Sequence, residues 1–123
     1  MPFLRTFLND FDLHASPTRT VDAVLGWGLK PTSEAGRRRA DREGLPYIAL
    51  EDGFLRSIGL GESGAATLSL IADDLGIYYD ATRPSRLEHL IQSADAWCDD
   101  AIMARSRRLI DGIVATGLSK TNM

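Results

Sequence analysis

A strand, a helix and a second strand follow one another over residues 20–52, and this unit constrains the fold more than any other feature of the chain. The run TVDAVLGWG (20–28) is apolar and closes on two glycines, which predicts a buried strand that ends in a loop. The segment 30–44 predicts an exposed helix with Thr32 or Ser33 as N-cap and Gly44 as its stop. The run IALED (48–52) predicts the second strand. Such a unit indicates an α/β fold with a small parallel sheet flanked by helices.

The composition fits one small domain. The chain has 123 residues, of which 44% are hydrophobic, and this is enough to form a packed core. The formal charge is −3 and no run of like charge exceeds Arg37–Arg39, which argues against nucleic acid as the ligand. Cys98 is the single cysteine, so the sequence favours a reducing cytoplasm and excludes an intrachain disulfide. Because no apolar run reaches the ~18 residues of a membrane helix, we expect a cytoplasmic chain, and peripheral binding at a membrane surface stays open.

Two acidic residues end the second predicted strand. Glu51 and Asp52 lie at its carboxyl end, where open α/β sheets bind their ligands. Adjacent strand residues point to opposite faces, so at most one of the two faces a given pocket. We favour Glu51 as a general acid or base, and Asp52 as a structural residue at the turn of Gly53. Arg56 suits a carboxylate or phosphate, although a salt bridge to Asp52 explains it equally well.

Weaker signals follow the second strand. The glycine-rich stretch 58–70 resembles a phosphate-binding loop only loosely, because it lacks the lysine of such loops. The segment LSLIADDLGIYYDAT (68–82) predicts a third apolar segment, followed by a short strand over Ile77–Tyr79. Asp73 and Asp74 are adjacent in it, but two acids supply too few ligands for a metal ion unless others converge. We therefore predict no metal site.

Helical patterns occupy both ends of the chain. Apolar residues at helical spacing predict a short helix or docked arm within residues 1–19, which we separate from a lobe over residues 20–123. Pro84 starts a predicted helix that runs through Ala94. A further predicted helix, over residues 95–116, ends at Gly117. The residues that we expect this last helix to bury are Ile102, Leu109, Ile110 and Ile113.

Four consecutive blocks of sequence resemble one repeat of the capsular polysaccharide biosynthesis and export family. The blocks are WGLKPTSE, LPYIALEDGFLRSIGLG, LSLIADDLGIYYDATRPSRLEHLI and LSKTN, and they extend from about Val21 to Asn122. Members of that family are β-Kdo glycosyltransferases, which build the short linker of the acidic sugar Kdo between a phospholipid and the capsule chain in Gram-negative bacteria. Thr121 departs from the family, which usually has tyrosine in its Ser-Lys-Tyr-Asn block.

The resemblance implies a retaining transfer of Kdo from CMP-Kdo to a lipid-linked Kdo acceptor, without a cofactor. It also implies a GT-B-like module of two Rossmann-like lobes, of which this chain resembles the acceptor-side lobe. The nucleotide-binding lobe and the covalent nucleophile would then lie outside this chain, which we expect to be a fragment. The expected partners are that lobe or a second module, the lipid-linked acceptor and the inner-membrane capsule export machinery.

Within this resemblance, Glu51 is the catalytic candidate and acts on the proton of the acceptor hydroxyl. The candidate substrate-binding residues are Asp52, Arg56, Ser57, Asp74, Tyr78 and Asp80. Arg56 is assigned to the Kdo carboxylate and the last three residues to the acceptor side, although hydrogen bonds that brace the loops explain them equally well. The alternative function is a non-catalytic Rossmann-like binding or docking domain in capsule polysaccharide export.

Overall fold

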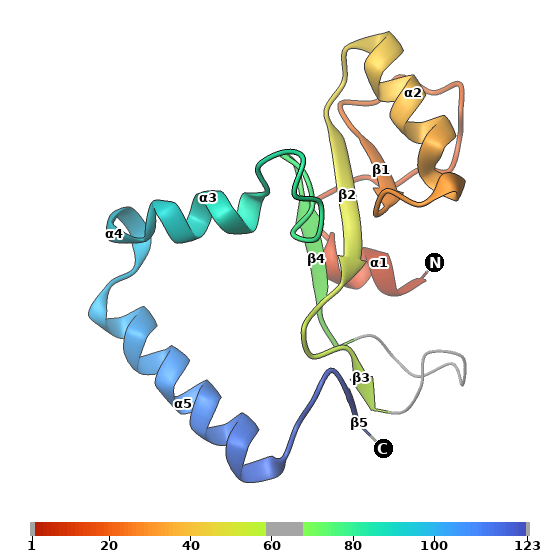
Figure 1. Cartoon of the computed structure of the whole chain (residues 1–123). Coiled ribbons are helices and arrows are strands. Elements are labelled where there is room, and N and C mark those ends of the chain that lie inside the picture. The colour runs from red at the N-terminus through yellow and green to blue at the C-terminus, as the bar shows by residue number, and fades with distance from the viewer. Residues whose placement is uncertain (1, 59–67, 123) are drawn as a thin grey trace.

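The computed structural model describes residues 2–58 and 68–122, and a small mixed sheet is at its centre (Figure 1). Strand β2 (Tyr47–Asp52) lies between β1 (Val24–Trp27) and β4 (Leu70–Asp73). The pair β1 and β2 is parallel, with Val24 opposite Tyr47 and Trp27 opposite Leu50, as the strand–helix–strand pattern predicts. The α/β fold class and the parallel unit are therefore confirmed.

The sheet is mixed and not purely parallel, because β4 runs antiparallel to β2. Glu51 lies opposite Ile71, and the pairing continues past the strand ends, because the Gly53 N–H donates to the Ser69 carbonyl at 3.0 Å. Antiparallel neighbours need no crossover helix between them, so the apolar segment expected within residues 68–82 did not reveal this pairing or its direction.

A second, two-residue parallel pair joins β3 (Ser57–Ile58) to β5 (Thr121–Asn122). The Arg56 N–H also donates to the Lys120 carbonyl at 2.8 Å. This pairing returns the end of the described chain to the region where β2 ends (Figure 1). The predicted glycine-rich loop lies outside the described residues over 59–67.

The helix expected between the first two strands is present as a short 3-10 helix η1 (Pro31–Ser33) and the helix α2 (Glu34–Glu43). Ser33 is the N-cap residue, but its hydroxyl donates to the carbonyls of Gly28 and Lys30, at 3.2 and 2.8 Å, and it does not cap the helix. Gly44 ends the helix in the left-handed conformation, with φ 65°, as predicted. The helix packs on the sheet face that carries Val24 and Tyr47.

Replacing Gly44 with alanine is expected to lower the free energy of unfolding by about 1 kcal/mol, because only the backbone conformation opposes the new side chain. A β-carbon at Gly44 would meet no atom within 4 Å. Gly112→Ala is the matched control, since Gly112 also has open space but lies within a helix, where alanine is favoured. Urea denaturation should show the two variants shifting in opposite directions, and a shift in the same direction would contradict the assigned conformation of Gly44.

The segment Ile77–Tyr79, predicted as a strand, is a loop, so this expectation is wrong. The side chain of Asp73 accepts hydrogen bonds from the Leu75 and Gly76 N–H groups and turns the chain directly after β4. Ile77 is nevertheless fully buried, which explains why the segment looked like a strand in sequence. The other buried apolar residues of the described chain are Ala40, Ala49 and Leu50.

The remaining helices are α1 (Pro2–Phe7), α3 (Arg86–Gln92), α4 (Ala94–Trp97) and α5 (Asp100–Thr116). Helix α1 lies within the predicted N-terminal arm, and the division of the chain at residue 20 stays a prediction. Helix α3 begins after Ser85, which forms a capping box with Glu88, so the predicted start at Pro84 is early. The single helix predicted over 95–116 is interrupted at Cys98 and restarts after the N-cap Asp99.

The expected burial of α5 is wrong for three of the four residues that we named. Ile102, Leu109 and Ile110 are exposed, and only Ile113 is partly buried. Helices α3, α4 and α5 extend away from the three-stranded sheet, and the chain then returns to pair β5 with β3 (Figure 1). The amphipathic pattern predicted the helix correctly, but the described chain offers no surface against which α5 packs.

Candidate functional site

The carboxyl ends of β1 and β2 meet at one edge of the sheet, where Gly28 follows one strand and Glu51 lies near the end of the other. Gly28 has φ 55°, and its N–H donates to the Leu50 carbonyl at 2.7 Å. The Tyr47 hydroxyl donates to the Gly28 carbonyl at 2.9 Å and fixes the turn from the other side. This is the edge at which open α/β sheets bind ligands, as we expected from the sequence.

Tyr79, which was not among the residues predicted from the sequence to form the site, completes a cluster at this edge. It lies in the loop after β4, yet its hydroxyl accepts a hydrogen bond from the Leu29 N–H at 3.1 Å, from a residue 50 positions earlier in the chain. The residue is 48% exposed. A β-carbon on Gly28 would collide with this hydroxyl and would lie 3.1 Å from Glu51 Oε2. The Tyr79 hydroxyl and the Glu51 carboxylate therefore flank Gly28, which leaves room for both.

Glu51 is half-buried, with its two carboxylate oxygens in different surroundings. The Asp52 N–H donates to Oε1 at 3.1 Å and holds the side chain in place. Oε2 faces the backbone of Gly28. A carboxylate that is fixed through one oxygen and approachable through the other can accept or donate a proton at a ligand hydroxyl. The favoured assignment of Glu51 is thus compatible with the geometry, which does not test it.

Asp52 and Arg56 form an ion pair through Arg56 Nε and Asp52 Oδ2. Their side chains are partly buried, with relative exposures of 18% and 26%. Of the two explanations that the sequence left open for Arg56, the structure shows the salt bridge. The pair therefore joins the last residue of β2 to the segment that follows the strand.

The acidic candidates of the following loop each have a local partner. Asp74 binds the Arg86 guanidinium through two hydrogen bonds, at 2.7 and 2.6 Å, and these bonds lower the pKa of its carboxyl group. Asp80 accepts from the hydroxyl and the N–H of Thr82, and these bonds likewise lower the pKa of Asp80. In the described chain neither carboxylate is hydrogen-bonded to Glu51, Gly28 or Tyr79, and both brace the loop.

Tyr78 and Ser57 are the remaining candidates. The ring of Tyr78 lies between two other aromatic rings, with centroid distances of 5.4 Å to Phe54 and 5.3 Å to Tyr79. Tyr78 is therefore the candidate that adjoins the Glu51 cluster, through Tyr79. The backbone of Ser57 pairs with Thr121 in the small β3–β5 sheet, and its assignment as a binding residue stays a prediction.

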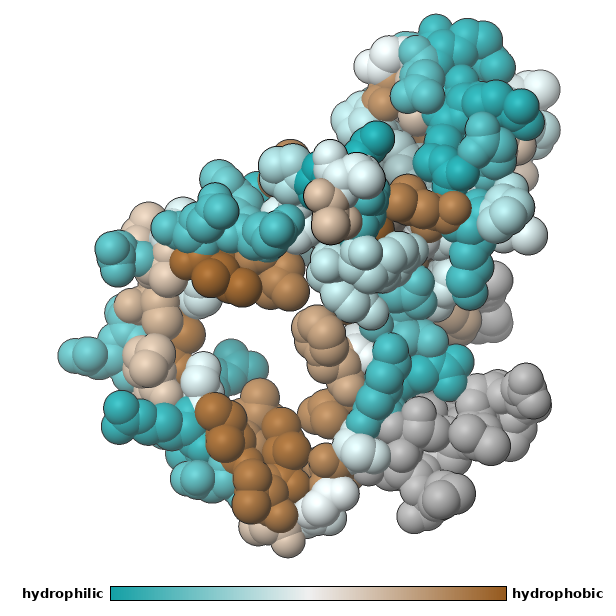
Figure 2. All heavy atoms as spheres, viewed as in Figure 1, coloured by the Kyte–Doolittle hydropathy of each residue, from teal (hydrophilic) through white to brown (hydrophobic). Residues whose placement is uncertain are grey.

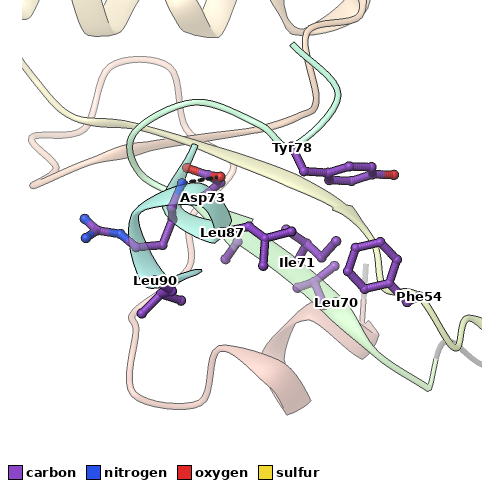
Figure 3. Close-up of a pocket in the computed structure, with 9 residues that line it drawn as sticks. Phe54, Leu70, Ile71, Asp73, Tyr78, Leu87 and Leu90 are labelled. Atoms are coloured by element: carbon purple, nitrogen blue, oxygen red, sulfur yellow. Dashed lines mark hydrogen bonds between the residues drawn. The ribbon is translucent and has the colours of Figure 1, made fainter. Parts of the chain in front are cut away.

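A pocket of about 240 Å³ lies along the free edge of β4, between that strand and α3 (Figure 3). Figure 3 shows Phe54 and Tyr78 at one end, Leu90 at the other and Leu87 between them. Its one buried carboxylate, Asp73, already accepts from the Arg86 N–H at 2.9 Å. The lining is mostly apolar, and such a pocket does not suit an acidic sugar, which needs several polar partners.

Among the described residues, no three His, Cys, Asp or Glu side chains are grouped so that they could hold a metal ion. The adjacent aspartates, which raised this question in the sequence, are engaged elsewhere. Asp73 binds backbone N–H groups and Asp74 binds Arg86. In the part of the chain that the structure describes, no helix is long and apolar enough to span a bilayer.

The fold and the cluster define a class: a Rossmann-like α/β lobe with a carboxylate and a phenol at the carboxyl edge of parallel strands. Residues 22–117 match the family described as capsule polysaccharide biosynthesis protein, and the chain belongs to this family. The resemblance of the four sequence blocks is thereby confirmed.

Relatives of known name agree with this assignment. The chain is 48% identical over 122 residues to the capsule polysaccharide modification protein LipA of Neisseria meningitidis serogroup A. It is 40% identical over 104 residues to the lipopolysaccharide-processing protein LpsZ of Rhizobium meliloti. The matches cover 99% and 85% of this chain but only 17% and 23% of those proteins. The chain therefore spans less than a quarter of the length of these curated relatives.

Solved structures of two Kdo transferases share the fold. The β-Kdo 2,4 transferase KpsC of Thermosulfurimonas dismutans is 44% identical and superimposes with a TM-score of 0.90, over 98% of this chain and 37% of that chain. The β-Kdo 2,7 transferase of the same organism is 39% identical, with a TM-score of 0.53 over 72% of this chain and 27% of that chain. The likeness supports the expected fold class, a Rossmann-like lobe of a GT-B-like module.

Proposed function

We propose that these residues form the acceptor-side lobe of a β-Kdo glycosyltransferase of capsule polysaccharide biosynthesis. The reaction moves Kdo from CMP-Kdo to a lipid-linked Kdo acceptor. The observation that carries the proposal is the Glu51–Gly28–Tyr79 cluster, at the ligand-binding edge of a lobe that superimposes on a β-Kdo 2,4 transferase with a TM-score of 0.90.

In this proposal Glu51 takes the proton from the acceptor hydroxyl while that oxygen forms a bond to the anomeric carbon of Kdo. Retention requires two displacements, so a nucleophile first replaces CMP on Kdo, and the acceptor oxygen then replaces the nucleophile. That nucleophile is proposed to lie outside these 123 residues, in the nucleotide-binding lobe. The Tyr79 oxygen accepts from the Leu29 N–H, which leaves its own O–H group to donate to the acceptor sugar.

The binding roles follow from what each side chain contacts. Arg56, which Asp52 orients, is proposed to face the Kdo carboxylate. Tyr78 is proposed to extend the acceptor surface from Tyr79, and Asp74 and Asp80 to hold the loop that carries both tyrosines. CMP-Kdo is the donor substrate, and no cofactor is part of the proposal.

The better superposition on the 2,4 transferase favours the 4-hydroxyl of an acceptor Kdo as the position that is extended. The partners in this proposal are the lipid-linked acceptor, the nucleotide-binding lobe or a second module, and the capsule export machinery at the inner membrane. The described residues contribute the acceptor side alone.

Sugar transfer is the direct test. Residues 1–123 would replace the matched segment of the Thermosulfurimonas dismutans 2,4 transferase, and the chimera would be incubated with CMP-Kdo and a Kdo-terminated lipid acceptor. We expect the acceptor to gain the mass of one Kdo residue, and NMR of the product to show a new 2,4 linkage. The unaltered transferase and a reaction without CMP-Kdo are the controls. A folded chimera that binds CMP-Kdo but extends no acceptor would contradict the proposal.

One observation favours a second candidate, a non-catalytic docking domain in capsule polysaccharide export. Asp52, Asp74 and Asp80 all bind partners within the chain, so these three candidate acids are engaged in holding loops. A docking domain predicts that the acceptor binds with equal affinity to the original chain and to a Glu51→Gln variant. It also predicts no sugar transfer by the chimera.

A further inference from the structure

Helix α5 has an apolar stripe that packs against nothing in the described chain. It has 17 residues, and from Ala101 onward each of them is exposed except Ile113, which is partly buried. Ile110 and Leu109 are 58% and 59% exposed. The apolar residues that share this face at helical spacing are Ile102, Met103, Leu109, Ile110, Ile113 and Val114. Because an isolated helix of this length is marginal in water, α5 needs a covering surface.

A second apolar surface faces the same space from α3. Leu87 and Leu90 are exposed, and so is Phe54, at the end of the pocket along β4. Figure 2 shows the apolar atoms of α3 and of α5 on the inner sides of a hollow that these helices enclose with the sheet. The outer sides of both helices are polar in the same view. Surfaces from two helices and a strand edge thus converge on one unfilled space.

The arrangement of α3, α5 and the sheet is also present in the longer β-Kdo 2,4 transferase. The chain superimposes on the 2,4 transferase over 98% of its residues, and a displaced α5 would lower the TM-score of 0.90. The same match covers 37% of that chain, so most of that protein lies outside it. A long polypeptide is therefore available in the relative to fill the hollow that the matched residues leave open.

We propose that the apolar faces of α3 and α5, together with Phe54, form a docking surface for polypeptide of the same transferase module that lies outside these 123 residues. The described part of the protein is then one half of a core that the other part completes. The inference concerns packing and does not depend on the sugar chemistry proposed above.

The shape of the surface argues against two other occupants. A lipid bilayer is flat, whereas the apolar faces of α3 and α5 line a concave space (Figure 2). A second copy of the chain would have to insert an apolar convex surface, but its helix α2 is rich in exposed arginines, with Arg38 and Arg42 at 70% side-chain exposure. Continuous polypeptide with its own apolar side chains fits the hollow better than either.

The test measures protection of α5. The 123-residue chain, carrying an affinity tag, would be expressed with the part of the Thermosulfurimonas dismutans transferase outside the match. We expect the two polypeptides to purify together in equal amounts. We also expect the amides of residues 100–116 to exchange with deuterium at least about tenfold more slowly in this complex than in the chain alone.

Two variants on one helix separate docking from helix stability. Ile110→Glu places a charge in the stripe, and Ala104→Glu places the same charge on the opposite side of α5, at an exposed position. Ile110→Glu is expected to weaken capture about tenfold or more, and Ala104→Glu to leave it unchanged. Circular dichroism of the free chains checks that both retain their helix.

Results of three kinds would overturn the proposal. One is equal capture of the two variants. Another is a complex in which α5 exchanges as fast as in the chain alone, or no complex at all. The last is protection of α5 by a second copy of the chain, or by anionic phospholipid vesicles, to the same degree as by the transferase polypeptide.

Discussion

Asp73→Ala is expected to be the most destabilising single substitution that we propose in this chain, lowering the free energy of unfolding by roughly 3–5 kcal/mol. Asp73 is 2% exposed, and its carboxylate accepts from the N–H groups of Leu75, Gly76 and Arg86 at 2.9, 2.8 and 2.9 Å. Alanine leaves these donors without their acceptor in a buried place, where each unsatisfied donor is costly. Urea denaturation followed by circular dichroism measures the change.

Asp74→Asn is the matched control, because Asp74 is adjacent and its substitution weakens an ion pair with Arg86 while the hydrogen bonds of Asp73 stay in place. The Asp74–Arg86 pair is exposed, and an exposed pair contributes little after solvent screening. Asp73→Asn should fall between the two, since the amide oxygen can still accept from Leu75 and Gly76 while the NH2 group confronts another donor. Equal stability of the Asp73→Ala and Asp74→Asn variants would contradict the structural role of Asp73.

The role of Asp73 links the stability of the fold to the candidate site. Its carboxylate starts the loop that carries Tyr79, and it also fixes the first N–H of α3. Through the Leu29 N–H, Tyr79 then ties this loop back to the end of β1. One buried side chain therefore determines where the second member of the Glu51 cluster lies.

The sequence patterns correctly predicted those elements whose position depends on residues close to one another in the chain. The strands β1 and β2, the helix between them and the glycine stops at Gly44 and Gly117 all follow from residues that act on their own neighbours. The direction of β4 could not be predicted in this way, because it depends on pairing with β2 along the edge. The exposure of α5 could not be predicted either, since an apolar stripe shows that a helix needs a partner but not where the partner is.

The candidate site likewise contains one residue that local sequence patterns indicate and one that depends on a long-range contact. Glu51 could be selected as a candidate because the end of a strand is visible in the sequence, and the carboxyl ends of parallel strands lie at the edge of the sheet that binds ligands. Tyr79 was missed, since its place beside Gly28 depends on a loop that folds back across 50 residues. A signal was present in the Tyr78–Tyr79 pair after the apolar Ile77, where two polar aromatics follow a buried residue. In loops, however, such a pair does not reveal which element it contacts.

Glu51→Gln is expected to lower kcat for Kdo transfer by about 10²–10⁴-fold, the range that general acid–base groups supply. Glutamine is isosteric, and its carbonyl oxygen can still accept from the Asp52 N–H, so the fold and the substrate KM should change little. The measurement uses the chimera with the Kdo transferase and follows extension of the lipid acceptor. Glu43→Gln is the control, because Glu43 is a carboxylate at the end of α2 that pairs with Arg39.

Tyr79→Phe tests whether the two oxygens beside Gly28 act together. Phenylalanine keeps the ring and its contact with Tyr78, but it removes the acceptor of the Leu29 N–H and the donor proposed for the acceptor sugar. If both groups contact the same hydroxyl, the double variant Glu51→Gln, Tyr79→Phe should lose less activity than the product of the losses of the two single variants. The reason is that Tyr79 contributes by orienting the hydroxyl that Glu51 deprotonates, so its contribution falls once Glu51 is replaced. Fully multiplicative losses would assign Tyr79 to loop structure, and unchanged kcat in Glu51→Gln would remove Glu51 from the reaction.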